Sequence, residues 1–258
     1  MWEISISIDS KNFEIARFVY QTLKSQTGEF GCVVTCYEEF GKIFVLLACP
    51  KEEKPRVKIL VERCITKSIC VFYKEKFLAE NLILPMHEDL SLTAFKKALV
   101  SFDKETDFYI ISKNLEFEND LYLDSFYNFK LKSLREKWLE LVQLANENSD
   151  YLVSNDAFFD LLKFLIENLE IGQDEVDVFE SENGYFIKSE NELQECAHEN
   201  LSQDGLISSI IEMCPKKINI FCKSDDLVAG FLSKIFEKRV NVCYNKNLSH
   251  IENFSVFK

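Results

Sequence analysis

The sequence has little glycine and proline, and neither gathers in any stretch. Its 258 residues include seven Gly and four Pro, and 47% of the residues are hydrophobic. A chain of this composition can bury a sizeable core, and it lacks the Gly-, Ser- and Pro-rich tracts typical of disorder or of long linkers. We therefore expect a folded chain whose parts abut closely.

A long apolar run is also missing. The longest clean run, residues 43–49, is far shorter than the ~20 residues that span a bilayer. The first ten residues, MWEISISIDS, carry Glu3 and Asp9 in place of the basic start of a signal peptide. We expect a cytoplasmic protein without a membrane span, in which the nine cysteines are reduced thiols that pack like small hydrophobes.

Several motifs that carry chemistry are absent. The chain contains no G-x-x-x-x-G-K-[ST], no G-x-G-x-x-G, no G-x-S-x-G and no H-E-x-x-H, so phosphate-cradling, dinucleotide, hydrolase and zincin interpretations lack their signatures. Only three histidines occur, His87, His198 and His250, and no motif joins them. We therefore expect no cofactor and assign no catalytic residue.

Cysteine spacing gives only weak metal signals. The candidate ligands form three pairs: Cys32 and Cys36, Cys64 and Cys70, and Cys196 and His198. In the strand-like run CVVTC the first and last side chains share a face, yet no C-x2-C pairs with a second one or with two histidines, as structural zinc requires. We interpret these cysteines as packed thiols and expect no metal ion. A catalytic dyad of Cys196 and His198 is disfavoured because residues two apart on a helix point in different directions.

The excess of negative charge sits in one segment. Residues 146–205 hold 16 Asp and Glu against 2 Lys, a net charge of −14, whereas the whole chain carries −13. Such a segment repels the nucleic-acid backbone, so nucleic-acid binding is disfavoured. If the segment binds a partner electrostatically, that partner is basic; the alternative is a solvated acidic surface that aids solubility.

The pattern of apolar residues predicts an α+β fold that begins with a small βαββα layer. We expect a strand at 3–8, a helix that starts after a cap at Asp9 or Ser10, a hairpin of 32–37 and 42–49 joined at Gly41, and a long helix from Pro55 to about Leu82. This order suits an antiparallel sheet with helices on one face. It assigns residues 1–85 to an N-terminal α+β region.

The rest of the chain is predicted to have a helical middle, 86–172, and a C-terminal α/β region, 173–258. Expected helices in the middle are 92–100, 126–145 and 157–171. A β-hairpin around Asn183-Gly184 opens the last region. It is followed by an αβαβ unit of helices and strands at 206–214, 218–222, 227–237 and 240–244.

Asp225 and Asp226 are the most suggestive carboxylates. They follow the predicted strand INIFCKS and precede a helix, and the carboxyl end of a strand often presents ligands in α/β folds. One interpretation is a metal-assisted enzyme that uses Asp225 or Asp226. The other, which we favour, is that one of them caps the helix.

The stretch LDSFYNFKLKSLREKWLELV, residues 123–142, combines aromatic and cationic side chains. On a helix its apolar residues form one broad stripe, while the cations flank the stripe and form no single patch. We therefore interpret it as a core helix capped by Asp124 or Ser125. A nucleic-acid-binding helix is the alternative.

Five blocks of sequence follow one another in the order of the YtxC-like family. They are LYLDSFYNFKLK (121–132), FFDLLKFLI (158–166), DEVDVF (174–179), DGLISSIIEMCPKKINIF (204–221) and IFEKRVNVC (235–243). The chain resembles this family over about residues 90–245. Leu134 stands where the family has a tyrosine, and Arg135 and Lys137 are basic where its helix is acidic, so no role of those features is carried over.

The resemblance implies a setting in sporulation, because the family is a group of spore-former proteins named for that process. It implies no reaction, cofactor or catalytic residue. The leading hypothesis is a sporulation-associated protein that acts by binding another macromolecule, with a basic protein as the expected partner. An unrecognised metal-assisted enzyme and a nucleic-acid-binding protein are the alternatives, and no oligomeric state is predicted.

Overall fold

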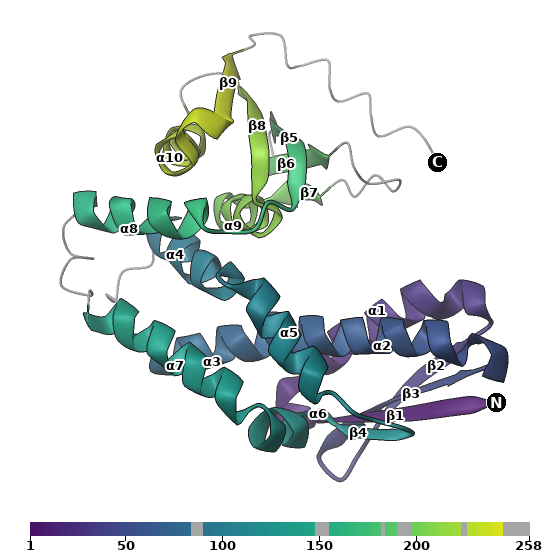
Figure 1. The fold of residues 1–258 in the computed structure, drawn as a ribbon. Helices are drawn as coiled ribbons and strands as arrows, with labels where there is room; N and C mark the ends of the chain where they lie inside the picture. Colours follow the sequence, from purple (N-terminus) through teal and green to yellow (C-terminus); the bar gives the residue numbers. More distant parts are fainter. Residues whose placement is uncertain (84–89, 148–154, 182–183, 190–197, 223–225, 245–258) are drawn as a thin grey trace. The chain divides into compact units, whose positions relative to one another are not determined.

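The computed structural model describes residues 1–83, 90–147, 155–181, 184–189, 198–222 and 226–244. The chain forms two compact units, one of Met1–Leu82 with Lys104–Asn146 and the other of Ile83–Asp103 with Glu147–Lys258. Each unit contains one small sheet and several helices (Figure 1). The predicted α+β class is confirmed.

The first unit begins with the predicted βαββα order. Its opening elements are β1 (Trp2–Asp9), α1 (Phe13–Thr27), β2 (Val33–Glu39), β3 (Lys42–Cys49) and α2 (Lys54–Ser68), which continues through a π-helical turn η4 (Ile69–Tyr73) into α3 (Lys74–Asn81). The expected cap at Asp9 or Ser10 is wrong, because a short 3-10 turn, η1 (Ser10–Asn12), precedes α1 and neither helix start has a side-chain cap bond. The hairpin turns through Phe40 and Gly41, both at positive φ.

Three further elements complete the first unit. They are α5 (Lys104–Asn114), the short strand β4 (Asp120–Tyr122), and a broken helix of α6 (Leu123–Ser125), η5 (Phe126–Lys130) and α7 (Lys132–Glu147). The sheet order is β2-β3-β1-β4, with β4 parallel to β1 and the other pairs antiparallel. Neither α5 nor β4 was predicted.

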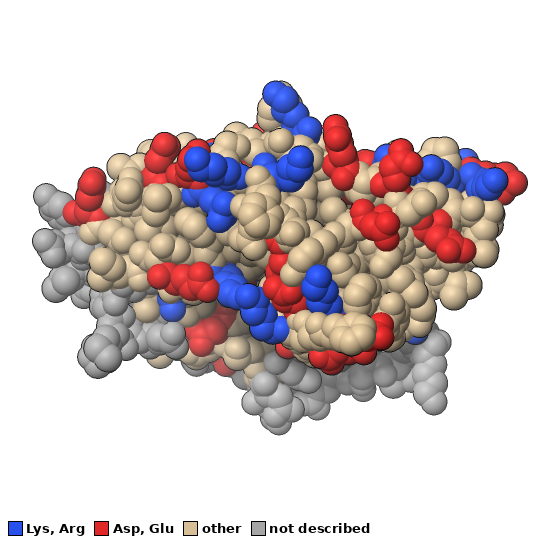
Figure 2. Space-filling model, turned by 90° about the horizontal axis from the view of Figure 1, so that it is seen from below, with Lys and Arg blue, Asp and Glu red and all other residues tan. Residues whose placement is uncertain are grey.

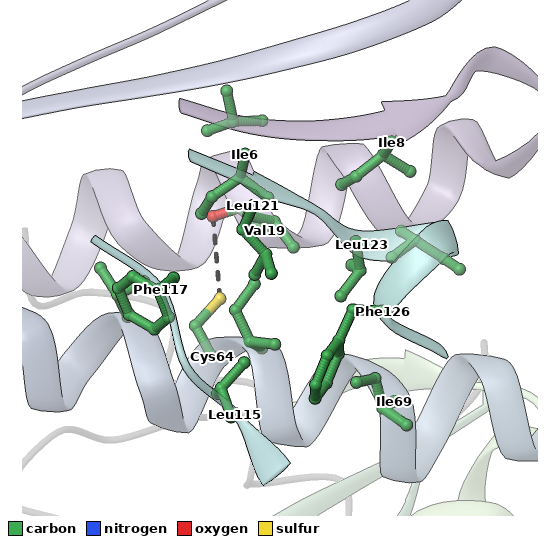
Figure 3. Packing of buried hydrophobic residues seen from close by; sticks show 14 of the residues in the cluster. Ile6, Ile8, Val19, Cys64, Ile69, Leu115, Phe117, Leu121, Leu123 and Phe126 are labelled. Atoms are coloured by element: carbon green, nitrogen blue, oxygen red, sulfur yellow. Dashed lines mark hydrogen bonds between the residues drawn. The ribbon is translucent and has the colours of Figure 1, made fainter. Parts of the chain in front are cut away.

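The core of the first unit lies between its sheet and helices α1 and α2 (Figure 3). Strand β1 alternates, so that Ile4, Ile6 and Ile8 are almost fully buried while the residues between them are partly exposed. Burial of each isoleucine contributes about 1.5–3 kcal/mol. Cys64 of α2 packs with them, and its thiol lies 4.0 Å from the carbonyl oxygen of Val19 in α1.

The second unit contains the predicted hairpin and αβαβ order. Its elements are α4 (Leu90–Ser101), α8 (Asn155–Glu167), β5 (Gln173–Ser181), β6 (Gly184–Ser189), β7 (His198–Leu201), α9 (Gln203–Met213), β8 (Pro215–Cys222), α10 (Leu227–Phe236) and β9 (Val240–Tyr244). The sheet order is β7-β6-β5-β8-β9, with β5, β8 and β9 parallel. Gly172 before β5 admits no side chain, because a Cβ there would lie 2.6 Å from the carbonyl oxygen of Met213.

The sheet of the second unit also has one buried face. Val176, Val178, Ile218 and Ile220 point into the core. On the other face three phenylalanine rings stack across neighbouring strands, with Phe179 between Phe186 and Phe221 at centroid distances of 4.7 and 4.8 Å.

The helices expected as a middle region, 86–172, are divided between the two units. Helices α5 and α7 belong to the first unit, whereas α4 and α8 belong to the second. The physical reason is that each helix packs against the core that its own buried residues meet: α7 buries an apolar stripe, whereas α5 buries Asp107 and Ile111. Trp138 of α7 joins the first core, and Phe95 of α4 contacts Phe158 of α8.

Candidate functional site

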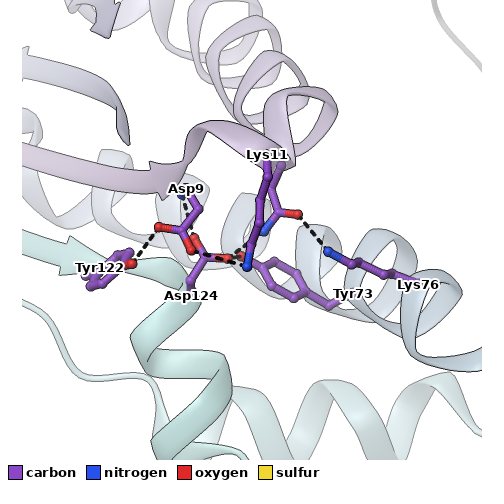
Figure 4. Close-up of polar contacts among 7 residues, drawn as sticks. Asp9, Lys11, Tyr73, Lys76, Tyr122 and Asp124 are labelled. Carbon is purple, nitrogen blue, oxygen red and sulfur yellow. Dashed lines mark hydrogen bonds and ion pairs between the residues drawn. The ribbon is translucent and has the colours of Figure 1, made fainter. Parts of the chain in front are cut away.

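The most elaborate polar arrangement in the first unit surrounds the carboxylate of Asp124, just after β4 (Figure 4). Asp124 is 5% exposed. Its two oxygens accept hydrogen bonds from the backbone N–H of Asp9 at 2.7 Å, from Nδ2 of Asn12 at 2.6 Å and from the hydroxyl of Tyr73 at 2.9 Å. These donors belong to two segments that are remote from Asp124 in sequence, so the carboxylate joins the end of β1 and the turn after it to the π-helical turn after α2.

A second carboxylate lies beside the first. Asp9 accepts a hydrogen bond from the hydroxyl of Tyr122 at 2.6 Å and forms an ion pair with the exposed Lys11 at 3.8 Å. The side-chain oxygen of Asn12 in turn accepts from Nζ of Lys76 at 3.2 Å. We call Asp9, Asn12, Tyr73, Tyr122 and Asp124 the Asp124 cluster.

The chemistry of the Asp124 cluster favours a structural role. Burial, with the Asp124 charge as the next cause, raises the pKa of Tyr73 far above its ordinary value, and the hydrogen bond to Asp9 is the main cause that raises the pKa of Tyr122 to about 12. Both tyrosines are therefore protonated donors at neutral pH and cannot serve as bases. Asp124 already accepts three hydrogen bonds. We therefore assign its carboxylate a structural role, which is to hold the end of β1 against η4, and no role in proton transfer.

A second buried carboxylate, Asp107 of α5, is fully inaccessible to solvent. It accepts from Nζ of Lys74 at 2.7 Å, from Nζ of Lys137 at 2.8 Å and from Nε1 of Trp138 at 3.0 Å. Lys74 is itself 1% exposed, and burial lowers the pKa of its ammonium while Asp107 opposes that shift. This Asp107 cluster ties α3, α5 and α7 together.

The stretch 123–142 is a core element, as predicted. Phe126, Leu131, Leu134, Trp138 and Val142 are all buried. The expected single helix over 126–145 is wrong in its first part, because a π-helical turn ends at Lys130 and Leu131 leaves helical geometry with φ −105 and ψ 36. The cap is wrong too, because α6 begins without a side-chain cap bond.

The cations of this stretch are mostly engaged within the protein. Lys137 pairs with Asp107, and Lys132 forms an ion pair with Glu136. Arg135 donates to the carbonyl oxygen of Asn128 at 2.6 Å and lies over the ring of Tyr127. These contacts leave no concentrated positive surface of the kind that phosphate binding requires.

Asp226 caps helix α10, which is the interpretation favoured from the sequence. Its carboxylate accepts from the backbone N–H of Val228 at 2.9 Å and from the hydroxyl of Tyr185 at 2.7 Å. Asp225 lies outside the described residues. Within the described part of the chain, no three His, Cys, Asp or Glu side chains lie together in a way that could hold a metal ion.

The described members of the candidate cysteine pairs belong to no group of three or more potential metal ligands. Cys36 is exposed, whereas Cys32 is partly buried, and Cys64 and Cys70 are both buried in helical segments. Cys196 lies outside the described residues, and His198 begins β7. All eight described cysteines are free thiols.

We expect the thiols to differ strongly in reactivity. Burial raises the pKa values of Cys64 and Cys70 to about 12, so neither forms thiolate at neutral pH. Among the eight described cysteines, Cys36 is the first to react with a thiol-specific reagent at pH 7, and Cys36→Ser removes the labelling at this position. Cys64 and Cys70 react only when the chain is unfolded by denaturant. Mass spectrometry of the labelled peptides checks this, and labelling of Cys64 at the rate of Cys36 contradicts it.

The acidic segment is partly neutralised by lysines from outside it. On β5, Asp174 pairs with Lys216 and Glu175 pairs with Lys217, both from β8. The hydrogen bond from Lys217 is the main cause that lowers the pKa of Glu175. Across the face drawn in Figure 2, cationic and anionic side chains are interspersed. At least Asp174 and Glu175 of the acidic segment therefore have a neighbouring cation.

The family model of the YtxC-like family matches residues 57–241 of the chain. The match covers more than half of the chain. The chain belongs to the YtxC-like family. No curated protein and no solved structure matches it.

Most residues of the Asp124 cluster and of the Asp107 cluster lie inside the region of this YtxC-like chain that the family model matches. Asp107, Asp124 and Tyr73 fall within residues 57–241, whereas Asp9 and Asn12 precede them. The first family block, 121–132, forms most of β4 and the turns that follow it, and so contains Asp124. This family block therefore supplies most of β4, the edge strand that pairs with β1 in the first sheet.

Proposed function

We propose that this YtxC-like chain is a cytoplasmic protein of the sporulation programme that acts by binding another protein and catalyses no reaction. The family resemblance supplies the setting. The observation that carries the proposal is that Asp107, Asp124 and Asp226 each have their acceptor oxygens engaged by donors of the fold, so that the carboxylates best placed for catalysis are structural.

The surfaces of the chain support the same conclusion. The edge strand β2 is exposed along nearly its whole length, and both sheets present apolar and aromatic side chains on the face opposite the buried one. Exposed apolar surface beside unpaired strand edges is typical of proteins that bind other proteins. No helix among the described residues combines the length and apolar character needed to cross a membrane.

Affinity capture tests the proposal. The full chain, tagged and recovered from sporulating cells of its host, is expected to retain one protein partner that the tag alone does not retain. Nuclease treatment of the extract is expected to leave that partner in place. Recovery of nothing beyond the tag control, or of nucleic acid as the retained species, contradicts the proposal.

A further inference from the structure

Strand β2 forms an outer edge of the first sheet. It pairs with β3 in continuous antiparallel register from Val33 opposite Ala48 to Glu39 opposite Lys42. In the described part of the chain, no main-chain hydrogen bond joins β2 to any element other than β3. The N–H and C=O groups along its outer side are therefore available to another strand.

The side chains of β2 are exposed on both faces of the sheet. Val33 is 67% exposed and Tyr37 45%, and only Val34 is partly buried. Tyr37 stacks on Phe44 of β3, with ring centroids 5.0 Å apart and planes inclined by 9°. An added strand would thus find an aromatic pair beside it on one face.

Most of the devices that normally protect an edge strand are missing from β2, whose only charges are Glu38 and Glu39 at its end. Such strands are usually very short, bulged, covered, or provided with lysine or proline. The segment VVTCYEE has neither of these residues and its pairing contains no bulge. The strand at the opposite edge, β4, is protected because it is only three residues long.

The charge of β2 indicates which strand it would accept. Glu38 and Glu39 end the strand on opposite faces, and the cation opposite Glu39, Lys42, lies over the ring of Tyr122 at 3.8 Å. A strand with lysine or arginine near these glutamates would complement them. In a symmetric pairing of β2 with β2, a second copy of the chain would present the same VVTCYEE, which contains no cation.

We propose that the outer edge of β2 is a docking site for an extended segment of a partner protein, which adds to the sheet as a fifth strand. Its lysine or arginine side chains lie beside Glu38 and Glu39, and its apolar side chains lie beside Val33 and Tyr37. This inference rests on the proposed function, because it names the surface and the chemistry of the partner.

Three synthetic peptides test strand addition. The first is as long as β2, alternates valine with threonine and carries two lysines at one end. The second has glutamates in place of the lysines, and the third is the lysine peptide with alternate amides N-methylated, which removes strand hydrogen bonds and keeps the charge. In NMR titrations of the full chain, we expect the lysine peptide to shift the amides of β2 and the other two peptides to bind at least about tenfold more weakly.

Charge-reversal variants provide the matched comparison. The double variant Glu38→Lys and Glu39→Lys is expected to bind the lysine peptide about tenfold or more weakly than the native chain does. The control, Glu75→Lys with Glu140→Lys, changes the net charge equally at exposed helix positions and is expected to leave binding unchanged.

Four results would overturn the inference. The first is binding of the N-methylated peptide as tight as that of the lysine peptide, and the second is amide shifts that are absent or confined to elements other than β2. The third is a shift of the β2 amides on addition of a single-stranded RNA, a twelve-nucleotide oligouridine. The fourth is a dimer of the chain that forms without peptide and protects the β2 amides from hydrogen exchange. None of them bears on whether cells contain a partner, so the capture experiment can succeed while this assignment fails.

Discussion

Asp124→Ala is expected to lower the free energy of unfolding by about 3–5 kcal/mol, because three donors lose their acceptor and each unsatisfied buried group costs about 1–3 kcal/mol. The substitution leaves the N–H of Asp9, the amide of Asn12 and the hydroxyl of Tyr73 without their acceptor. Urea denaturation followed by tryptophan fluorescence measures the loss, because both tryptophans, Trp2 and Trp138, are buried in the first unit.

A neighbouring carboxylate provides the control for this result. Asp120 begins the short strand β4 that precedes Asp124, and it is exposed, so Asp120→Ala is expected to change the unfolding free energy by less than about 0.5 kcal/mol. Asp124→Asn retains the shape and one acceptor oxygen and is expected to fall between the two. If Asp124→Ala unfolds at the same urea concentration as the native chain, the structural role of the Asp124 cluster is wrong.

Asp107→Asn is expected to destabilise the chain by a similar amount, about 3–5 kcal/mol, because it removes the carboxylate charge that pairs with the buried ammonium of Lys74. Adding Lys74→Met removes that buried charge. The double variant is therefore expected to be more stable than Asp107→Asn alone. Glu105→Gln, an exposed position on the same helix, is the matched control.

The pH dependence of Asp107→Asn has a definite sign. Burial lowers the pKa of Lys74 below its ordinary 10.5 in the folded chain, and the pKa falls further when Asp107 no longer favours the cation. Between the folded and unfolded pKa values the unfolded chain binds more protons, so stability rises with pH. The difference in unfolding free energy between Asp107→Asn and the native chain is therefore expected to shrink as the pH rises toward 10. A difference that is constant or grows with pH contradicts the assignment.

Elements with a strong local pattern were predicted correctly. Strand β9 has the bounds that were expected, and the hairpin of β2 and β3 turns at Gly41 as expected. In both cases the alternation of side chains over five or more residues carries the information. Strand β4 was missed because it has only three residues, and its pairing with β1 depends on residues more than a hundred positions away.

Helix α5 was missed for a related reason. Only Asp107 and Ile111 of this helix are buried, so it has no apolar stripe to recognise, and a buried aspartate has the appearance of a surface residue in sequence. The break at Leu131 was equally hidden, because π-helical turns have no signature of their own in the pattern of apolar residues.

The polar clusters could not be assembled from the sequence. Asp124 was interpreted as a helix cap because an aspartate before a helix usually is one, whereas its actual donors are 51 to 115 residues away. Asp226 was interpreted correctly, because its backbone acceptor contact with Val228 is local. Local hydrogen bonds follow from sequence pattern, and long-range ones follow only from the fold.

The central claim is that this YtxC-like chain works by binding a partner protein through β2. The most direct measurement is affinity capture from sporulating cells with three full-length chains: the native one, the Glu38→Lys and Glu39→Lys variant, and the Glu75→Lys and Glu140→Lys control. We expect to recover the same protein with the native chain and with the control, and to lose it with the β2 variant. Equal recovery by all three chains contradicts the assignment of β2, and no recovery by any of them contradicts the function.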